Sequence, residues 1–316
     1  MSLFASSTEM KSLAQGCLLG QLAGDALGSL VEFQSPEQIR HSYPEGVRYL
    51  ADGGTFNTIA GQPTDDSEMA LLLARMLAEE GAYDAVAATA AYVFWIDSGP
   101  FDCGNTIAAG LKGEPDPGSQ ANGAMMRVSP LGIFGAKYEL AQIGGWARED
   151  AAITHPHPVC LQANALFAMA IAHAIKTGAG GHAVYEAIQA WAVEMDAEPS
   201  LLAAVCRAAE APPADYTRQM GWVLIAFQNA LWQLLHAPGF EEGVVDTVMR
   251  GGDTDTNAAI CGALLGEVYG RESVPTQWRV TLQNCRPRAG APGGYRPRPE
   301  CFWPVDVLGL AERLVA

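Results

Sequence analysis

The sequence has few basic residues for its length. Among 316 residues, 19 Lys and Arg stand against 35 Asp and Glu, which gives a formal net charge of −16 and a pI near 4.7. Binding to nucleic acid or to an anionic membrane depends on clustered Lys and Arg, so we expect neither partner. An acidic chain is better suited to hold cations.

Cysteine pairs and a secretion signal are lacking as well. The seven cysteines include no Cys-x-x-Cys pair, which predicts reduced thiols in the cytoplasm and no zinc site. The N-terminus has no apolar segment followed by a cleavage site, so no signal peptide is expected. The longest uncharged runs, 151–175 and 219–240, are interrupted by polar residues or proline, which favours buried helices over membrane spans.

Runs of alternating β-branched residues are nearly absent, and the dominant pattern is helical. Apolar residues recur at helical spacing in 10–30, 67–80, 84–97, 158–177, 183–195, 199–210, 218–236, 242–250 and 256–269. No connection resembles a long flexible linker. We therefore expect residues 1–316 to form one compact all-α domain and a monomer. An Arg- and Pro-rich loop at 286–299, before a short terminal helix, is expected to be a solvated loop packed by Trp303, or else a lid.

Glycine recurs at every fourth position in two segments. The first holds Gly16, Gly20, Gly24 and Gly28, and the second holds Gly262, Gly266 and Gly270. On a helix this spacing makes a smooth stripe that another backbone can approach closely. We expect these stripes to pack tightly in the core, perhaps against each other.

Two acidic stretches precede apolar segments, "TDDSE" at 64–68 and "GGDTDT" at 251–256. Each could be an ordinary helix start, with Thr64 or Asp65 as the N-cap and Glu68 completing a capping box. A cap needs only one oxygen, however, and each stretch offers two carboxylates and a hydroxyl. Asp253 and Asp255 could converge only in the turn before the helix, where two glycines are present.

A cation site is the alternative to a helix start. Carboxylates held close together repel one another and raise one another's pKa unless a cation lies between them. Hard oxygen ligands of this kind suit magnesium or manganese. The four aspartates and two threonines of the two stretches could therefore hold two divalent cations, Mg²⁺ or Mn²⁺.

These stretches, with three further motifs, resemble the ADP-ribosylglycohydrolase family. "GDALGSLVEF" at 24–33 looks like the first motif of that family, "NGAMMRVSPLGIF" at 122–134 like its Asn-Gly-Ala-x-Met-Arg block, and "THPHP" at 154–158 like its Thr-His element. The motifs run from about residue 12 to 280, so the C-terminal tail is not covered. The resemblance implies a multi-helix orthogonal bundle with a central cleft that holds two metal ions.

The resemblance also implies roles for individual residues. The metal ligands would be Thr64, Asp65, Asp66, Asp253, Asp255 and Thr256. Glu32 would be the first candidate for the acid/base carboxylate and Asp102 the second, although Asn105 replaces an aspartate of the family pattern in that loop. Asn122, Gly123, Met126 and Arg127 would line the ADP side of the cleft, and His155 could touch the ribose. For Arg127 a structural salt bridge is the alternative. Asp25 would support a ligand or cap a helix.

The function implied is hydrolysis of the bond between ADP-ribose and a modified side chain, most often arginine. Such cleavage develops oxocarbenium character at the anomeric carbon, so the ribose must be held and a water positioned. The partner would be an ADP-ribosylated protein or a small ADP-ribosyl conjugate. The alternative is a protein of the same fold that binds without catalysis, as a structural, immunity or regulatory partner. Serine linkages and the choice between Mg²⁺ and Mn²⁺ stay open at this stage.

Overall fold

The computed structural model describes residues 4–290 and 292–316, so one position of the predicted 286–299 loop lies outside the described residues. Over this range the regular structure is helical, with two isolated bridges between extended residues, Gly53 with Thr58 and Ala121 with Trp222. The all-α expectation is thereby confirmed.

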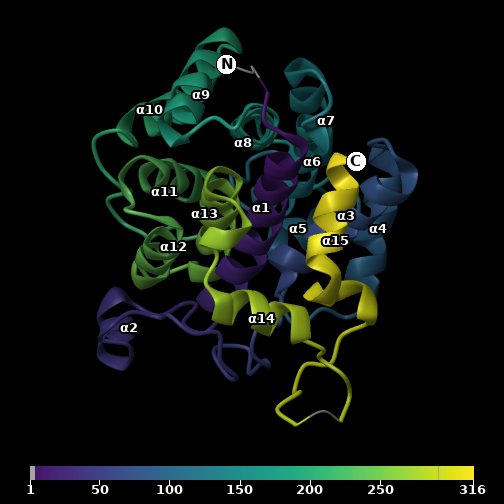
Figure 1. Ribbon diagram of the computed structural model, residues 1–316, viewed down its shortest axis with the longest axis vertical. Helices are drawn as coiled ribbons and strands as arrows, with labels where there is room; N and C mark the ends of the chain where they lie inside the picture. Colours follow the sequence, from purple (N-terminus) through teal and green to yellow (C-terminus); the bar gives the residue numbers. More distant parts are fainter. Residues whose placement is uncertain (1–3, 291) are drawn as a thin grey trace.

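The helices follow one another along the whole chain (Figure 1). In chain order they are α1 (Ser7–Gly28), α2 (Pro36–Ser42), α3 (Asp65–Glu80), α4 (Ala85–Asp97), α5 (Asn105–Leu111), α6 (Ser129–Gly135), α7 (Leu140–Ala152), α8 (Pro158–Thr177), α9 (Gly181–Glu194), α10 (Pro199–Arg207), α11 (Val223–His236), α12 (Phe240–Met249), α13 (Thr254–Tyr269), α14 (Thr276–Asn284) and α15 (Val307–Val315). Short 3₁₀ turns cover Met125–Arg127, Arg271–Ser273, Glu300–Phe302 and Pro304–Asp306.

Helices α1 and α13 lie side by side at the centre of the molecule, although they come from opposite ends of the chain (Figure 1). The predicted glycine stripes make this contact. A Cβ added to Gly20 would overlap the carbonyl oxygen of Gly262, and one added to Gly16 would overlap that of Gly266. Only glycine permits this backbone approach, so the expected packing of one stripe on the other is confirmed.

The other helices surround this central pair. Helix α8 packs on α6 and α7, α11 and α12 pack on α13, and α15 packs on α1 and α3. Helix α8 is long and apolar enough to cross a membrane, but 78% of its most apolar window is buried inside the protein. Its apolar character is therefore used in the core, as the sequence analysis expects.

The predicted helices are present, with differences at their ends. The segment predicted as 218–236 becomes helical only at Val223, because residues 216–222 form a loop that pairs with Ala121. Helices α2, α5, α6, α7 and α14 were not predicted. Three of them have seven residues, too few for an apolar period to stand out, and α7 contains two adjacent glycines.

Candidate active site

The two acidic stretches form the N-termini of α3 and α13. Thr64 is the N-cap residue of α3 and Asp253 that of α13, yet neither side chain makes a capping hydrogen bond. Glu68 does not complete a capping box either, because its carboxylate accepts from Trp95 and Arg298 instead. Neither stretch is therefore the capped helix start with a capping box that was considered as the alternative.

The turn before α13 is built as the sequence suggested. Gly251 and Gly252 have φ of 75° and 77°, a region that favours glycine. Asp253 ends this turn, whereas Asp255 lies in the first turn of α13 itself. Both side chains line the same pocket, so they converge across the helix start and not only in the turn before it.

The two stretches meet at Asp255. Carboxylate oxygens of Asp25, Asp66 and Asp255 lie within 4.8 Å of one another, and so do oxygens of Glu32, Asp102 and Asp255. Asp255 belongs to both triads. Carboxylates from α1, α3 and α13, and from the segments after α1 and α4, are thus gathered around one side chain.

Asp25 is a central member of this cluster that the sequence analysis left as a cap or a supporting group. It is fully buried, and it accepts hydrogen bonds from the Thr64 hydroxyl at 2.8 Å and from the backbone amides of Thr64 and Ser67 at 3.2 Å. The Thr64 hydroxyl also approaches Asp66 at 3.1 Å. Asp25 therefore joins α1 to the start of α3 and orients Asp66.

Burial makes the charged form of this cluster costly. It raises the pKa of Asp25 to about 7, and burial together with the charges of Asp102 and Asp253 raises the pKa of Glu32 to about 9. The pKa values of Asp65, Asp66 and Asp255 are also raised well above the usual range, first by burial and then by their acidic neighbours. Protons or cations must neutralise the cluster.

The unpartnered oxygens of the cluster favour cations. Glu32 Oε2, Asp66 Oδ1 and Asp255 Oδ2 are buried and have no hydrogen-bond partner. A buried carboxylate oxygen without a donor is unusual in a folded protein and needs a specific explanation. Hard divalent cations take carboxylate oxygens as ligands, so these residues fit such ions.

A pocket of about 320 Å³ opens over the cluster. Ten of the thirteen predicted site residues line it: Glu32, Asp65, Asp102, Asn122, Gly123, Met126, His155, Asp253, Asp255 and Thr256. Thr64 and Asp66 lie directly beneath, with Thr256 donating to Asp66 at 3.4 Å. The structure therefore brings together twelve of the thirteen residues, counting the ten that line the pocket and the two beneath it.

Arg127 is the exception. It was expected to line the ADP side of the cleft, but it is fully buried outside the pocket. Its guanidinium donates to Asp150 at 3.0 Å and to Thr154 at 2.9 Å and stacks on the Tyr92 ring at 4.4 Å. Arg127 therefore forms a structural salt bridge, and its side chain does not line the pocket. Arg127 supports the adjacent His155 through Thr154, whose hydroxyl lies 2.7 Å from His155 Nδ1.

The part of the pocket wall formed by Asn122, Gly123 and His155 carries no charge. Asn122 donates to Asp253 at 2.8 Å, and Gly123 lets its backbone lie close to the His155 ring. His155 is buried with its Nε2 unpartnered, and burial lowers its pKa to about 3, so it is neutral at physiological pH. This part of the wall offers a neutral ring nitrogen and an amide that is bonded to one of the carboxylates.

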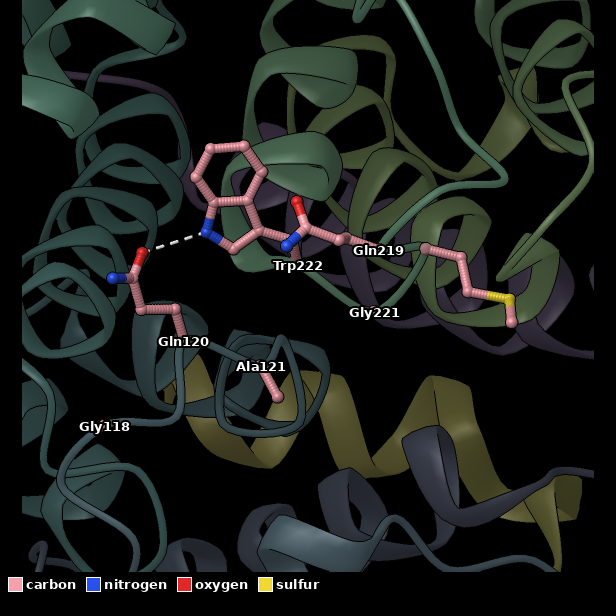
Figure 2. Close-up of a pocket in the computed structure, with 7 residues that line it drawn as sticks. Gly118, Gln120, Ala121, Gln219, Gly221 and Trp222 are labelled. Carbon is pink, nitrogen blue, oxygen red and sulfur yellow. Dashed lines mark hydrogen bonds between the residues drawn. The ribbon is translucent and has the colours of Figure 1, made fainter.

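A second pocket, of about 660 Å³, adjoins the first (Figure 2). The two share Ala121, Met220 and Gly221 in their walls. Figure 2 shows the Trp222 indole joined to the Gln120 side chain by a hydrogen bond, which its Nε1–H donates over 2.9 Å. Gln120 also lies 3.2 Å from His157. This part of the pocket wall was not predicted, because the helix expected at 218–236 includes Trp222, whereas α11 begins at Val223.

Comparisons with known proteins agree with this arrangement. The sequence profile of the ADP-ribosylglycohydrolase family matches residues 6–315. The chain is 31% identical to the ADP-ribosyl-[dinitrogen reductase] glycohydrolase of Rhodospirillum rubrum over 279 residues, covering 85% of this chain and 90% of the relative. It is 26% identical to the ADP-ribosylarginine hydrolase Tri1 of Pseudomonas putida (strain GB-1), covering 84% of this chain and 72% of that one.

A solved structure extends the likeness to the whole fold. The structure, titled an ADP-ribosylglycohydrolase-related protein complex, superposes with a TM-score of 0.80 at 26% identity and covers 98% of each chain. The profile match spans nearly the entire sequence. The fold also gathers buried carboxylates from distant helices into one candidate site. The chain therefore belongs to the ADP-ribosylglycohydrolase family.

Proposed function

We propose that this glycohydrolase removes ADP-ribose from arginine side chains of a modified protein, with the help of two divalent cations, Mg²⁺ or Mn²⁺. The observation that carries the proposal is the position of Asp255, which belongs to both triads of buried carboxylates. One shared carboxylate between two acidic groups suits a pair of neighbouring cations. The names of two relatives, one acting on ADP-ribosylarginine, support the substrate class.

The residues that would hold the cations come from both acidic stretches. Asp66, Asp255 and Thr256 lie at the base of the pocket, and Asp65 and Asp253 lie in its wall. The Thr64 hydroxyl lies 2.8 Å from Asp25 and 3.1 Å from Asp66, its single proton can be donated to only one of them, and its lone pairs would be available to a cation. Bound divalent cations supply electrostatic polarisation and hold vicinal hydroxyls of a sugar in place.

Glu32 and Asp102 are the carboxylates placed to move protons. Both line the pocket, and both have an oxygen within 4.8 Å of Asp255. They come from two loops outside the helical core, so they can face a scissile bond that is held over the cluster. One carboxylate would accept a proton from the attacking water, and a protonated one would donate to the departing guanidine nitrogen.

The adjoining pocket would take the nucleotide part of the substrate. It opens directly from the pocket over the carboxylates, and the Trp222 indole is fixed by Gln120 at its wall. An aromatic ring held in this way provides a stacking surface for a nucleobase. Trp222→Ala should therefore raise KM about tenfold and leave kcat within about twofold, because stacking contributes about 1–3 kcal/mol to binding.

The decisive experiment is release of ADP-ribose from an arginine-modified protein, assayed with Mg²⁺, with Mn²⁺ and with a chelator. We expect turnover with one of the ions, and a loss of about 10²–10³-fold in kcat in Asp255→Asn, as for other groups that stabilise a transition state directly. Full activity with chelator would overturn the metal dependence. Release from a serine-linked substrate but not from arginine would change the substrate class and leave the chemistry in place. We further propose a monomer in the cytoplasm.

A further inference from the structure

The C-terminal strap, residues 286–299 apart from 291, has no assigned role in the proposed reaction. It leads from α14 towards the turn at Glu300–Phe302 and, unlike a solvated loop, it buries an arginine. Arg298 is only 7% exposed. The Trp303 indole donates to the Arg298 carbonyl at 2.8 Å, so Trp303 does pack the strap, as expected.

The Arg298 guanidinium forms a bidentate ion pair with Glu68 of α3. Nε donates to Glu68 Oε1 at 2.8 Å and Nη2 to Glu68 Oε2 at 2.7 Å, and the Trp95 indole donates to the same carboxylate at 2.9 Å. Both side chains are almost fully buried. Paired donors in this fork geometry fix the orientation of the guanidinium plane.

The remaining donors of Arg298 reach the loop that carries Asp102. Nη1 donates to the Ser98 carbonyl at 3.1 Å and Nη2 to the Ser98 hydroxyl at 2.8 Å. Ser98 is the C-cap residue of α4, and the chain continues from it to Asp102 at the pocket. Two residues earlier in the strap, the Arg296 guanidinium carbon lies 6.0 Å from the centroid of the Phe101 ring.

The loop that carries Asp102 is only partly packed: the Phe101 ring contacts Phe56, with ring centroids 5.5 Å apart, and Cys103 packs against the core. None of residues 98–106 is buried, and Gly99 has a φ of 68°. A segment held by few apolar contacts opens at low free-energy cost. A carboxylate that must lie within hydrogen-bond distance of a reacting atom cannot be placed by such a loop alone.

We propose that Arg298 is a positioning residue, which clamps the start of the Asp102 loop onto Glu68 and thereby holds Asp102 in the pocket. The inference rests on the proposed function, in which Asp102 moves a proton. It assigns the strap to the placement of a reactive group, in place of the lid that was expected as the alternative to a solvated loop.

Arg75 provides a matched control. It lies on α3 and donates to Asp306 at 2.7 and 2.8 Å and to the Cys301 carbonyl at 2.9 Å, so it too joins α3 to the C-terminal segment. Its hydrogen bonds go to Cys301, Trp303 and Asp306, which all lie outside the Asp102 loop. Removal of Arg75 therefore tests a general loosening of the C-terminal segment.

The test compares Arg298→Ala and Arg75→Ala in the full-length protein. Because a displacement of about 1 Å in a reacting group can cost about 10²-fold, we expect kcat to fall at least about tenfold in Arg298→Ala. KM should stay unchanged. Arg75→Ala should keep its kcat, and Arg298→Lys should recover part of the loss.

A double-mutant cycle with Asp102→Asn separates positioning from loss of structure. If Arg298 acts through Asp102, Arg298→Ala should reduce kcat less than about twofold in the Asp102→Asn background. An equal loss in both backgrounds overturns the proposal, and so does an unchanged kcat in Arg298→Ala. If Arg298→Ala does not fold, Ser98→Ala removes one of the two contacts with the loop and takes its place.

Hydrogen exchange gives a readout that does not depend on activity. Amides of residues 98–106 should exchange faster in Arg298→Ala than in the wild type, while those of the central helices α1 and α13 should not. Faster exchange in a protein that releases no ADP-ribose would leave the clamp in place and reject the proposed function. Unchanged exchange would overturn the clamp, whatever the activity.

Discussion

Thr256 donates its hydroxyl proton to Asp66 at 3.4 Å, although 190 positions separate the two residues in the chain. The contact joins the first turn of α13 to the first turn of α3. It depends on the close approach of α13 to α1, which also supplies Asp25 to the same carboxylate cluster.

The carboxylate shared by both triads should control cation binding. In the wild type, saturating Mn²⁺ or Mg²⁺ at about 100 times the dissociation constant should stabilise the protein by about 2.7 kcal/mol. We expect Asp255→Asn to abolish the corresponding thermal shift, because it removes an oxygen from both groups. The control is Asp196→Asn, because Asp196 is exposed and lies outside the carboxylate cluster. Its backbone φ of 51° is one that asparagine also tolerates. A full cation-induced shift in Asp255→Asn would contradict the metal site.

The same cluster should make cation binding pH-dependent. The pKa of Asp25 is about 7 and that of Glu32 about 9, both above the ordinary values of 3.8 and 4.5. Without cations, the folded chain therefore binds more protons than the unfolded chain. The stabilisation that these two carboxyl groups contribute is fully present below about pH 4 and is lost as the pH rises towards 9. Cations compete with these protons, so the Mn²⁺-induced thermal shift should grow from pH 6 to pH 8. Thermal melts with Mn²⁺ and with chelator would measure it, and a shift that shrinks with pH would contradict the proposal.

The contact between α1 and α13 should not tolerate a single methyl group. Gly20→Ala would press a Cβ onto the backbone of Gly262, which cannot move aside as a side chain can. We expect a loss of about 3 kcal/mol or more in the free energy of unfolding, measured by denaturant titration.

Gly145→Ala is the matched control for that substitution. Gly145 lies within α7, and a Cβ there meets no atom within 4 Å. This exchange should leave stability unchanged or raise it by up to about 1 kcal/mol, because alanine is the better helix former. Equal effects of the two substitutions would contradict the packing argument.

The buried pair of Arg127 and Asp150 should contribute to stability and not to substrate binding. Both side chains are fully buried, and Tyr92 donates to Asp150 at 2.7 Å. Arg127→Met leaves an unpaired buried carboxylate, so we expect a loss of about 3–5 kcal/mol in unfolding free energy. Any folded variant should keep its KM. A KM raised tenfold or more with unchanged stability would indicate that Arg127 contacts the substrate.

The pair also offers a compensating variant. Replacing both partners by apolar residues, as in Arg127→Met with Asp150→Leu, removes the unpaired charge and should recover part of the lost stability. Denaturant titration of the single and double variants would show whether the loss comes from the buried charge.

Local patterns in the sequence were sufficient for most of the fold. The helical periodicity of α3, α8 and α13 is continuous over several turns, and the glycines of α1 and α13 predict their own contact. Helices as short as α5, with seven residues, have too few apolar positions for a period. They form because neighbouring elements bury one face of them.

The sequence by itself determined which chemistry is available, since clustered aspartates beside hydroxyls favour divalent cations in any setting. Only the tertiary structure decided which carboxylates lie close together, that Asp25 belongs to the cluster, and that Arg127 does not line the pocket. The reason is that distances between side chains far apart in the sequence are set by the packing of α1, α3 and α13. A spacing along the chain specifies the direction of a side chain on its own helix, but not the helix that it faces.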